Sequence, residues 1–160
     1  MALKDKIKID SFKVEKMRPD QAKEVLKLAV AAQSSFGLTD RKAPSLFFDE
    51  IGRLIQNNIK DSFVFKTETD KIFAAFIIKP QTSISAELSL AVSDPNVIQT
   101  VEMYDGFFKQ INSNKFKIFF AKVYKRRKRF QIYVRFLNKL GFNEIVADDE
   151  DSLTLSLKKA

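Results

Sequence analysis

The chain has 160 residues, 45% of them hydrophobic, which is enough for one core but too little for two, so a single domain over residues 1–160 is expected. It contains neither cysteine nor histidine, which excludes disulfides, thiolate chemistry, serine–histidine triads and zinc sites, and no metal site is expected. The N-terminus has no apolar h-region, and no run of eighteen uncharged apolar residues occurs. We therefore expect neither a signal peptide nor a membrane span, and a protein of the cytoplasm or of a particle assembled there.

The first third of the sequence predicts one strand followed by two helices. Apolar and polar residues alternate over about residues 7–17, which indicates a strand. Pro19 and Asp20 then begin a predicted helix of about residues 19–33, and residues 34–39 have the composition of a loop. Pro44 begins the second predicted helix. Its apolar face consists of Phe47, Ile51, Leu54, Ile55 and Ile59.

The middle of the chain predicts three strands and a helix. Residues 63–66 and 72–78 are β-rich and flank a charged turn, which predicts a hairpin. Over residues 84–92 apolar and polar residues alternate strictly, which predicts a strand with Ala86, Leu88 and Leu90 on one face. Residues 94–96 end this strand, and the apolar spacing over residues 97–112 predicts a helix.

The last third predicts a strand over residues 118–124, a helix, and two strands over about residues 142–146 and 153–157. Tyr133, Phe136, Leu137 and Leu140 fall on one face of the helix, and Gly141 is placed to end it as the C′ residue. The order of the elements predicts an α/β fold with one mixed sheet and helices covering its faces.

Two local sequences and this order of elements resemble the GNAT N-acetyltransferase superfamily. The sequence FKVEKMRPDQA at residues 12–22 resembles the family's opening strand, which ends in Arg-Pro before the first helix. The sequence FLNKLGF at residues 136–142 resembles its closing element, F-Y-E-K-L-G-F. There the glycine supplies a left-handed helix cap, while its apolar neighbours fix the helix to the next strand. The resemblance spans about residues 10–158 and implies the GNAT-like acyl-CoA N-acyltransferase fold, with six to seven strands and about four helices.

The resemblance also implies where acetyl-CoA would bind. In GNAT enzymes the turn after the fourth strand carries Gln/Arg-x-x-Gly-x-Gly/Ala, whose glycines let backbone N–H groups approach the pyrophosphate at a helix N-terminus. The corresponding residues 93–100 contain no glycine and no basic side chain. Pro95 removes an N–H donor, and Asp94 places a negative charge where the pyrophosphate would lie. We therefore expect no cofactor at this turn, where Asp94 or Asn96 can instead cap the next helix.

The residues that the resemblance would assign to catalysis are mostly missing. Leu137 occupies the position of the tyrosine that protonates the leaving thiolate, and leucine has no proton to donate. Tyr133 lies on the same apolar helix face, which favours a place in the core. Glu87 is the one candidate general base, in a strand where many family members have a carboxylate. A solvent-facing strand residue would give the same pattern, so Glu87 alone does not indicate catalysis.

The positive charge is concentrated in residues 122–139. This segment has eight basic residues and no acid, so it accounts for the formal net charge of +8. It favours a polyanionic partner, such as nucleic acid, a phosphorylated ligand or an acidic protein surface, although a solvated basic loop is an equal alternative. Partner-binding candidates are Lys122, Lys125, Arg126, Arg127, Lys128 and Arg129. Of these, Arg126, Arg127 and Lys128 are also the candidates for the cofactor's phosphates if acetyl-CoA binds.

Three functions are compatible with these features. The leading hypothesis is a GNAT-fold protein that has lost acetyl-CoA-dependent catalysis and has a structural or interaction role. The second is an active N-acetyltransferase with an atypical cofactor turn, and the third is a nucleic-acid-binding domain. Some tailed phages encode small GNAT-like proteins beside their virion genes. The cysteine-free composition, rich in lysine, asparagine and phenylalanine, is compatible with such a virion component.

Overall fold

The computed structural model describes residues 6–32, 44–125 and 130–159. Their order of helices and strands is the one that the sequence predicts. Along the chain the elements are β1 (Phe12–Lys16), the 3₁₀ turn η1 (Pro19–Gln21), α1 (Ala22–Ala31), α3 (Pro44–Asn57), β2 (Phe63–Thr67), β3 (Ile72–Pro80), β4 (Ser85–Ser93), α4 (Val101–Ser113), β5 (Ile118–Tyr124), α5 (Phe130–Lys139), β6 (Glu144–Asp148) and β7 (Ser152–Lys158).

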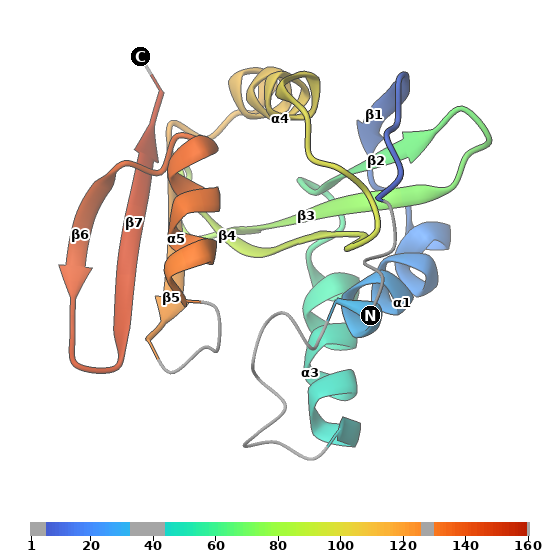
Figure 1. Cartoon of the computed structure of the whole chain (residues 1–160). Coiled ribbons are helices and arrows are strands. Elements are labelled where there is room, and N and C mark those ends of the chain that lie inside the picture. The colour runs from blue at the N-terminus through green and yellow to red at the C-terminus, as the bar shows by residue number, and fades with distance from the viewer. Residues whose placement is uncertain (1–5, 33–43, 126–129, 160) are drawn as a thin grey trace, which may run out of the picture.

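The seven strands form one sheet in the order β1-β2-β3-β4-β5-β7-β6 (Figure 1). Neighbouring strands are antiparallel, with the exception of β4 and β5, which are parallel. A parallel pair needs a crossover connection, and α4 supplies it between β4 and β5. The predicted mixed sheet is therefore confirmed.

Helices cover both faces of this sheet. On one face, Val25 of α1 and Ile55 of α3 pack with Ile77 of β3 in a buried cluster. On the other face, Phe107 of α4 and Leu137 of α5 belong to a second, larger cluster. Figure 1 shows α4 above strands β2 to β4, with α1 and α3 below them. Within the described ranges, no helix has the length and apolarity that crossing a membrane requires.

Aromatic rings fill the layer between the sheet and α4. The Phe107 side chain has no exposed surface, and its ring centroid lies 5.8 Å from that of Phe63 and 5.0 Å from that of Phe76. The Phe65 ring lies 5.5 Å from that of Phe76. Ring pairs at these separations add to the free energy gained from burial. Aromatic contacts with β2 and β3 therefore fix the position of α4.

The β4 strand does not keep the strict alternation that its sequence predicts. Its pairing with β3 shifts, so that Ile77 pairs with Leu90 and Ile78 with Leu88. Ser89 is left as the extra residue of a β-bulge. Leu88 belongs to the cluster under α4 and α5, whereas Leu90 belongs to the cluster under α1 and α3. The prediction of a common face is therefore wrong beyond Ser89.

The start of α4 also differs from the predicted residue 97. Ile7 forms an isolated parallel bridge with Val97, and the chain from there to Thr100, the N-cap of α4 with extended backbone angles, is not helical. Asp94 and Asn96, the expected caps, lie upstream of this segment, so that prediction is wrong. The first strand is shorter than the predicted residues 7–17, because Ile7 pairs with Val97 instead of with β2.

The end of α5 confirms the predicted helix stop. Gly141 has a φ of +103°, a left-handed conformation, and a Cβ there would lie 2.9 Å from Leu157 Cδ1. The Gly141 N–H donates to the Asn138 carbonyl at 3.1 Å, and the Phe142 N–H donates to the Leu137 carbonyl at 3.0 Å. These two bonds form a Schellman motif, which ends the helix and directs the chain into β6.

Candidate functional site

The parallel strands β4 and β5 pair at one end and separate at the other. The paired residues are Ser85 with Ile118, Ala86 with Phe119, and Glu87 with Phe120. No later residue of β4 pairs with β5, and the bulge at Ser89 follows directly. The two strands therefore diverge toward their C-terminal ends, and Glu87 lies where the divergence begins.

Glu87, the candidate general base, lines a hollow of about 250 Å³, which we call the Glu87 hollow. The other residues around it are Gln81, Phe120, Lys122 and Thr154. Ala86 points into the core under α4 and α5, so Glu87, its neighbour in the strand, points to the opposite face of the sheet. The Glu87 side chain is half-buried, and its Oε1 accepts a hydrogen bond of 2.7 Å from Ser89 Oγ. The hollow is thus lined by an oriented carboxylate and by Lys122, whose Nζ lies 5.4 Å from the centroid of the Tyr124 ring.

The segment between β4 and α4 uses its backbone N–H groups within the chain. The Asp94 N–H donates to the Phe73 carbonyl at 2.8 Å, and the Ile98 N–H donates to the Ile7 carbonyl at 2.9 Å. Two further bonds lie within the turn. The Asn96 N–H donates to Asp94 Oδ1 at 2.9 Å, and the Val97 N–H donates to the Asp94 carbonyl at 3.0 Å. Pro95 has no N–H group. Every N–H of residues 94–98 is therefore engaged or absent. Asp94 precedes α4 in this segment, and Glu102 is an acid in the first turn of the helix.

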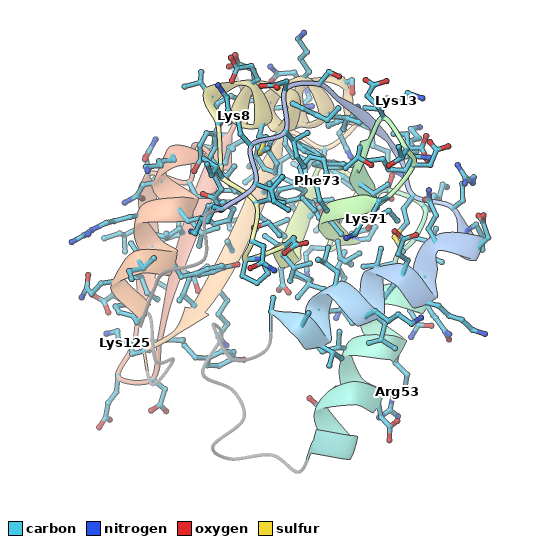
Figure 2. All side chains as sticks on the ribbon, turned by 45° about the vertical axis from the view of Figure 1, so that its right-hand side comes forward. Lys8, Lys13, Arg53, Lys71, Phe73 and Lys125 are labelled. Atoms are coloured by element: carbon cyan, nitrogen blue, oxygen red, sulfur yellow. The ribbon has the colours of Figure 1, made fainter. Side chains whose placement is uncertain are left out.

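Side chains fill the space between α4 and α5 near this segment. The ring centroids of Tyr104 on α4 and Phe136 on α5 are 6.4 Å apart, and the Tyr104 hydroxyl donates to Gln99 Oε1 at 2.8 Å. Met103 and Phe73 line the same space. Phe73 is labelled at the centre of Figure 2. Only about 30 Å³ remains there, roughly the room for one water molecule. Burial in this space raises the pKa of the Tyr104 hydroxyl.

Sequence comparison finds no match, neither to a protein-family model nor to a curated protein. Structure comparison instead finds acetyltransferases. An acetyltransferase from Thermus thermophilus superposes with a TM-score of 0.68 at 14% identity, covering 96% of this chain and 100% of that one. The PaiA N-acetyltransferase of Thermoplasma acidophilum, in complex with coenzyme A, gives 0.67 at 11% identity, covering 93% and 99%. A GNAT-family acetyltransferase from Listeria monocytogenes gives 0.66 at 11% identity, covering 96% and 99%.

This chain has the GNAT acetyltransferase fold. The match extends over nearly the whole of both chains, and the seven strands and four α-helices of the described residues agree with the expected architecture. Identities of 11–14% establish the fold and not the activity.

Within the GNAT fold, α5 corresponds to the closing helix, where the resemblance implies a catalytic tyrosine. Leu137, which stands at that position, has no exposed surface and is part of the core. Tyr133 is half-buried, with its ring 6.0 Å from that of Phe136. Both side chains lie on the sheet face that α5 covers, whereas Glu87 points to the other face. The structure therefore does not bring these candidates together.

The described part of the basic segment 122–139 is divided between two sides of the GNAT sheet. Lys122 lines the Glu87 hollow, while Arg135 and Lys139 occupy exposed positions on α5. Lys125, at the lower left in Figure 2, forms an ion pair with Asp148. The remaining candidates, Arg126, Arg127, Lys128 and Arg129, lie outside the described residues. Their expected contacts stay predictions.

Three features of the site were not predicted from the sequence. They are the bulge at Ser89, the bridge between Ile7 and Val97, and the contact between Tyr104 and Phe136. Ser89 falls at a polar position of the predicted alternation, so the sequence gives no sign of the bulge. The other two join residues far apart in the sequence, and no local pattern indicates them.

Proposed function

We propose that this chain is a GNAT-fold protein that has lost acetyl-CoA-dependent catalysis and has a structural or interaction role. The observation that carries the proposal is the engagement of every backbone N–H in residues 94–98. A pyrophosphate at this turn needs free N–H groups, and it would meet the Asp94 carboxylate instead. Each intrachain hydrogen bond broken to admit it would cost about 0.5–1.5 kcal/mol.

Two further features support the proposal. The space beside Tyr104 and Phe136 is narrowed by these side chains to about 30 Å³, compared with about 250 Å³ in the Glu87 hollow. Leu137 also leaves α5 without the tyrosine that the family uses as an acid. The residues present at these positions therefore do not fit the cofactor that the fold family implies.

Titration calorimetry with acetyl-CoA tests this proposal. We expect no binding heat up to about 1 mM acetyl-CoA, which corresponds to a binding free energy weaker than about −4 kcal/mol. The double variant Arg126→Gln/Arg127→Gln is titrated in parallel, with Lys13→Gln, an exposed lysine on β1, as the charge control. Micromolar binding to the unmodified chain would overturn the proposal. If the double variant lost this binding and Lys13→Gln kept it, the phosphates of acetyl-CoA would be assigned to the basic segment.

An active N-acetyltransferase with an atypical cofactor site is the second candidate, and the position of Glu87 favours it. Glu87 lies where β4 and β5 diverge, lines a hollow of about 250 Å³ and is oriented by Ser89. Thiol release from acetyl-CoA, measured with a panel of amines, separates the two candidates. For an enzyme, Glu87→Gln should lower turnover by about 100-fold or more, whereas Glu150→Gln, at an exposed position between β6 and β7, should leave it unchanged. Our proposal expects no turnover in any of these proteins.

As a non-catalytic domain, the chain would meet an acidic partner through residues 122–139, within a larger assembly such as a phage virion. The formal charge of +8 supports this part of the proposal. Fluorescence anisotropy with labelled duplex DNA and with an acidic peptide distinguishes the two partner classes. Phosphate contacts to DNA would give an affinity that falls steeply with salt. Binding to neither probe at low salt would contradict this role for the segment.

A further inference from the structure

A second hollow, at the opposite end of α4 from the turn that contains Asp94, has a different character. It has a volume of about 380 Å³ and lies where β1 and α4 end and β2 begins. The residues around it include Lys16, Lys60, Asp61, Gln110, Asn114 and Lys115, and we call it the lysine hollow. Three lysines thus line one concave surface, with a single acid among the residues around it.

The lysines of this hollow do not neutralise carboxylates of the described chain. Lys16 and Lys60 are exposed and form no ion pair with residues 6–32, 44–125 or 130–159. Lys115 lies over the ring of Phe116, with its Nζ 5.1 Å from the ring centroid. Asp61, the acid beside them, takes part in none of these ion pairs either. The positive charge of the hollow is therefore not compensated within the described structure.

The dipole of α4 does not account for these lysines. The last carbonyl groups of a helix carry partial negative charge and attract cations. Lys159 already meets this need, because its Nζ donates to the Asn114 carbonyl and lies 3.5 Å from the Asn112 carbonyl. Lys16 and Lys60 are additional charges. Like charges around a concave surface focus the potential there and attract a ligand of opposite sign.

Neutral donors accompany the ammonium groups. Asn114 Oδ1 accepts a hydrogen bond of 3.0 Å from the Phe116 N–H, which fixes the amide and leaves its NH₂ group to donate. Gln110 adds a second, half-buried amide. Ammonium groups that bind as point charges, together with amide donors, suit phosphate oxygens. The volume lies within the range of about 300–1,000 Å³ typical of small-molecule pockets.

From these observations we infer that the lysine hollow binds a small molecule bearing a diphosphate group. A diphosphate carries several anionic oxygens in a compact group, which suits a concave surface of about 380 Å³ lined by three lysines. The site is independent of the Glu87 hollow and of the turn at Asp94, with which it shares no lining residue.

Calorimetry with inorganic pyrophosphate at low ionic strength tests this inference. We expect saturable binding to the unmodified chain and a loss of about tenfold in affinity for Lys16→Gln and for Lys60→Gln, equivalent to one charge-assisted hydrogen bond each. Asp61→Asn removes the one acid of the lining and should strengthen binding. Lys13→Gln is the matched control, because Lys13 is an exposed lysine of the same strand that does not line the hollow. The affinity of this variant should stay within about twofold.

Several outcomes would overturn the inference. These are no pyrophosphate binding at about millimolar concentration, an equal loss of affinity in Lys13→Gln, or sulfate binding as tightly as pyrophosphate at matched ionic strength. Binding of duplex DNA that Lys16→Gln and Lys60→Gln weaken, without pyrophosphate binding, would assign the hollow to nucleic acid and would also overturn it. The same variants separate this site from the proposed loss of cofactor binding. If acetyl-CoA binds and Lys16→Gln and Lys60→Gln weaken the binding, a phosphate of the ligand lies in the lysine hollow. If these variants leave the affinity unchanged, acetyl-CoA binds at another site.

Discussion

The two ends of α4 differ in charge and in openness. At its N-terminal end stand Asp94 and Glu102, the N–H groups of residues 94–98 are engaged or absent, and side chains leave about 30 Å³ of space. At its C-terminal end stand Lys16 and Lys60, around a hollow of about 380 Å³. Acids near a helix N-terminus and bases near its C-terminus both stabilise the helix dipole. Acids thus precede and begin α4, whereas the lysines at its other end form no ion pair within the described residues.

Removing the packing of α4 should give the largest effect, because both ends depend on the position of this helix. Phe107→Ala deletes a fully buried ring that contacts Phe63 and Phe76, and we expect a loss of about 3–5 kcal/mol in the free energy of unfolding. Urea denaturation measures it. Val101→Ala, at a side chain 72% exposed on the same helix, should change stability by less than about 0.5 kcal/mol. Equal effects of the two substitutions would contradict this description of the core.

A smaller effect is expected from the N-terminal end. Asp94→Ala removes the side-chain acceptor of the Asn96 N–H and should cost about 1 kcal/mol in urea denaturation. Because the other N–H groups stay engaged with Phe73 and Ile7, acetyl-CoA binding should not appear. Asp105→Ala, an exposed acid one turn along α4, is the control for charge. Micromolar acetyl-CoA binding by Asp94→Ala would show that one carboxylate alone blocks the turn.

At the C-terminal end, Lys159→Met keeps an apolar stem but removes the charge that meets the Asn114 carbonyl. We expect a loss of about 0.3–1 kcal/mol in thermal or urea unfolding, the usual value of a cation at a helix end. Lys117→Met, at an exposed lysine in the neighbouring loop, should have no measurable effect. If both variants lose the same stability, Lys159 does not cap α4 specifically.

The smallest expected effect on stability concerns Glu15, which precedes Lys16 on β1. Hydrogen bonds from the Lys66 ammonium group, and then from the Gln21 amide, hold the pKa of Glu15 below its usual range. The stability that Glu15 contributes is therefore complete above about pH 4.3, the ordinary glutamate pKa, and is lost as the pH falls through the lower folded-state value. Urea midpoints measured across this acidic window should decline in the unmodified chain and in Glu68→Gln. Glu15→Gln should show a weaker decline, and an unchanged slope would contradict the assignment.

Local patterns predicted those parts of the fold whose cause is local. The stop of α5 depends on Gly141 and on bonds to Leu137 and Asn138 within one turn, so the sequence around the glycine indicates it. The start of α4 depends on Ile7, ninety residues before Val97, and an apolar residue at helical spacing gives no sign of that bridge. The predicted start at residue 97 failed for this reason.

In the candidate site, too, features with a local cause were visible in the sequence, and features that depend on distant segments were not. The absence of glycine and the presence of Asp94 are visible in residues 93–100 themselves. The engagement of the Ile98 N–H and the contact of Tyr104 with Phe136 arise only when separate elements pack together. The lysine hollow has the same origin, since Lys16, Lys60 and Lys115 come from three segments of which none is unusually basic. A count of charge along the chain pointed to residues 122–139 instead.

The contact between Tyr104 and Phe136 has a consequence for the way the fold responds to its surroundings. A gap that a ligand fills stabilises a protein only in proportion to the logarithm of the ligand concentration. Here β4 and β5 share only three residue pairs, and the gap between α4 and α5 is filled by side chains of the chain itself. That filling is present at every concentration. The contribution that this contact makes to the stability of the fold therefore does not depend on the concentration of any ligand.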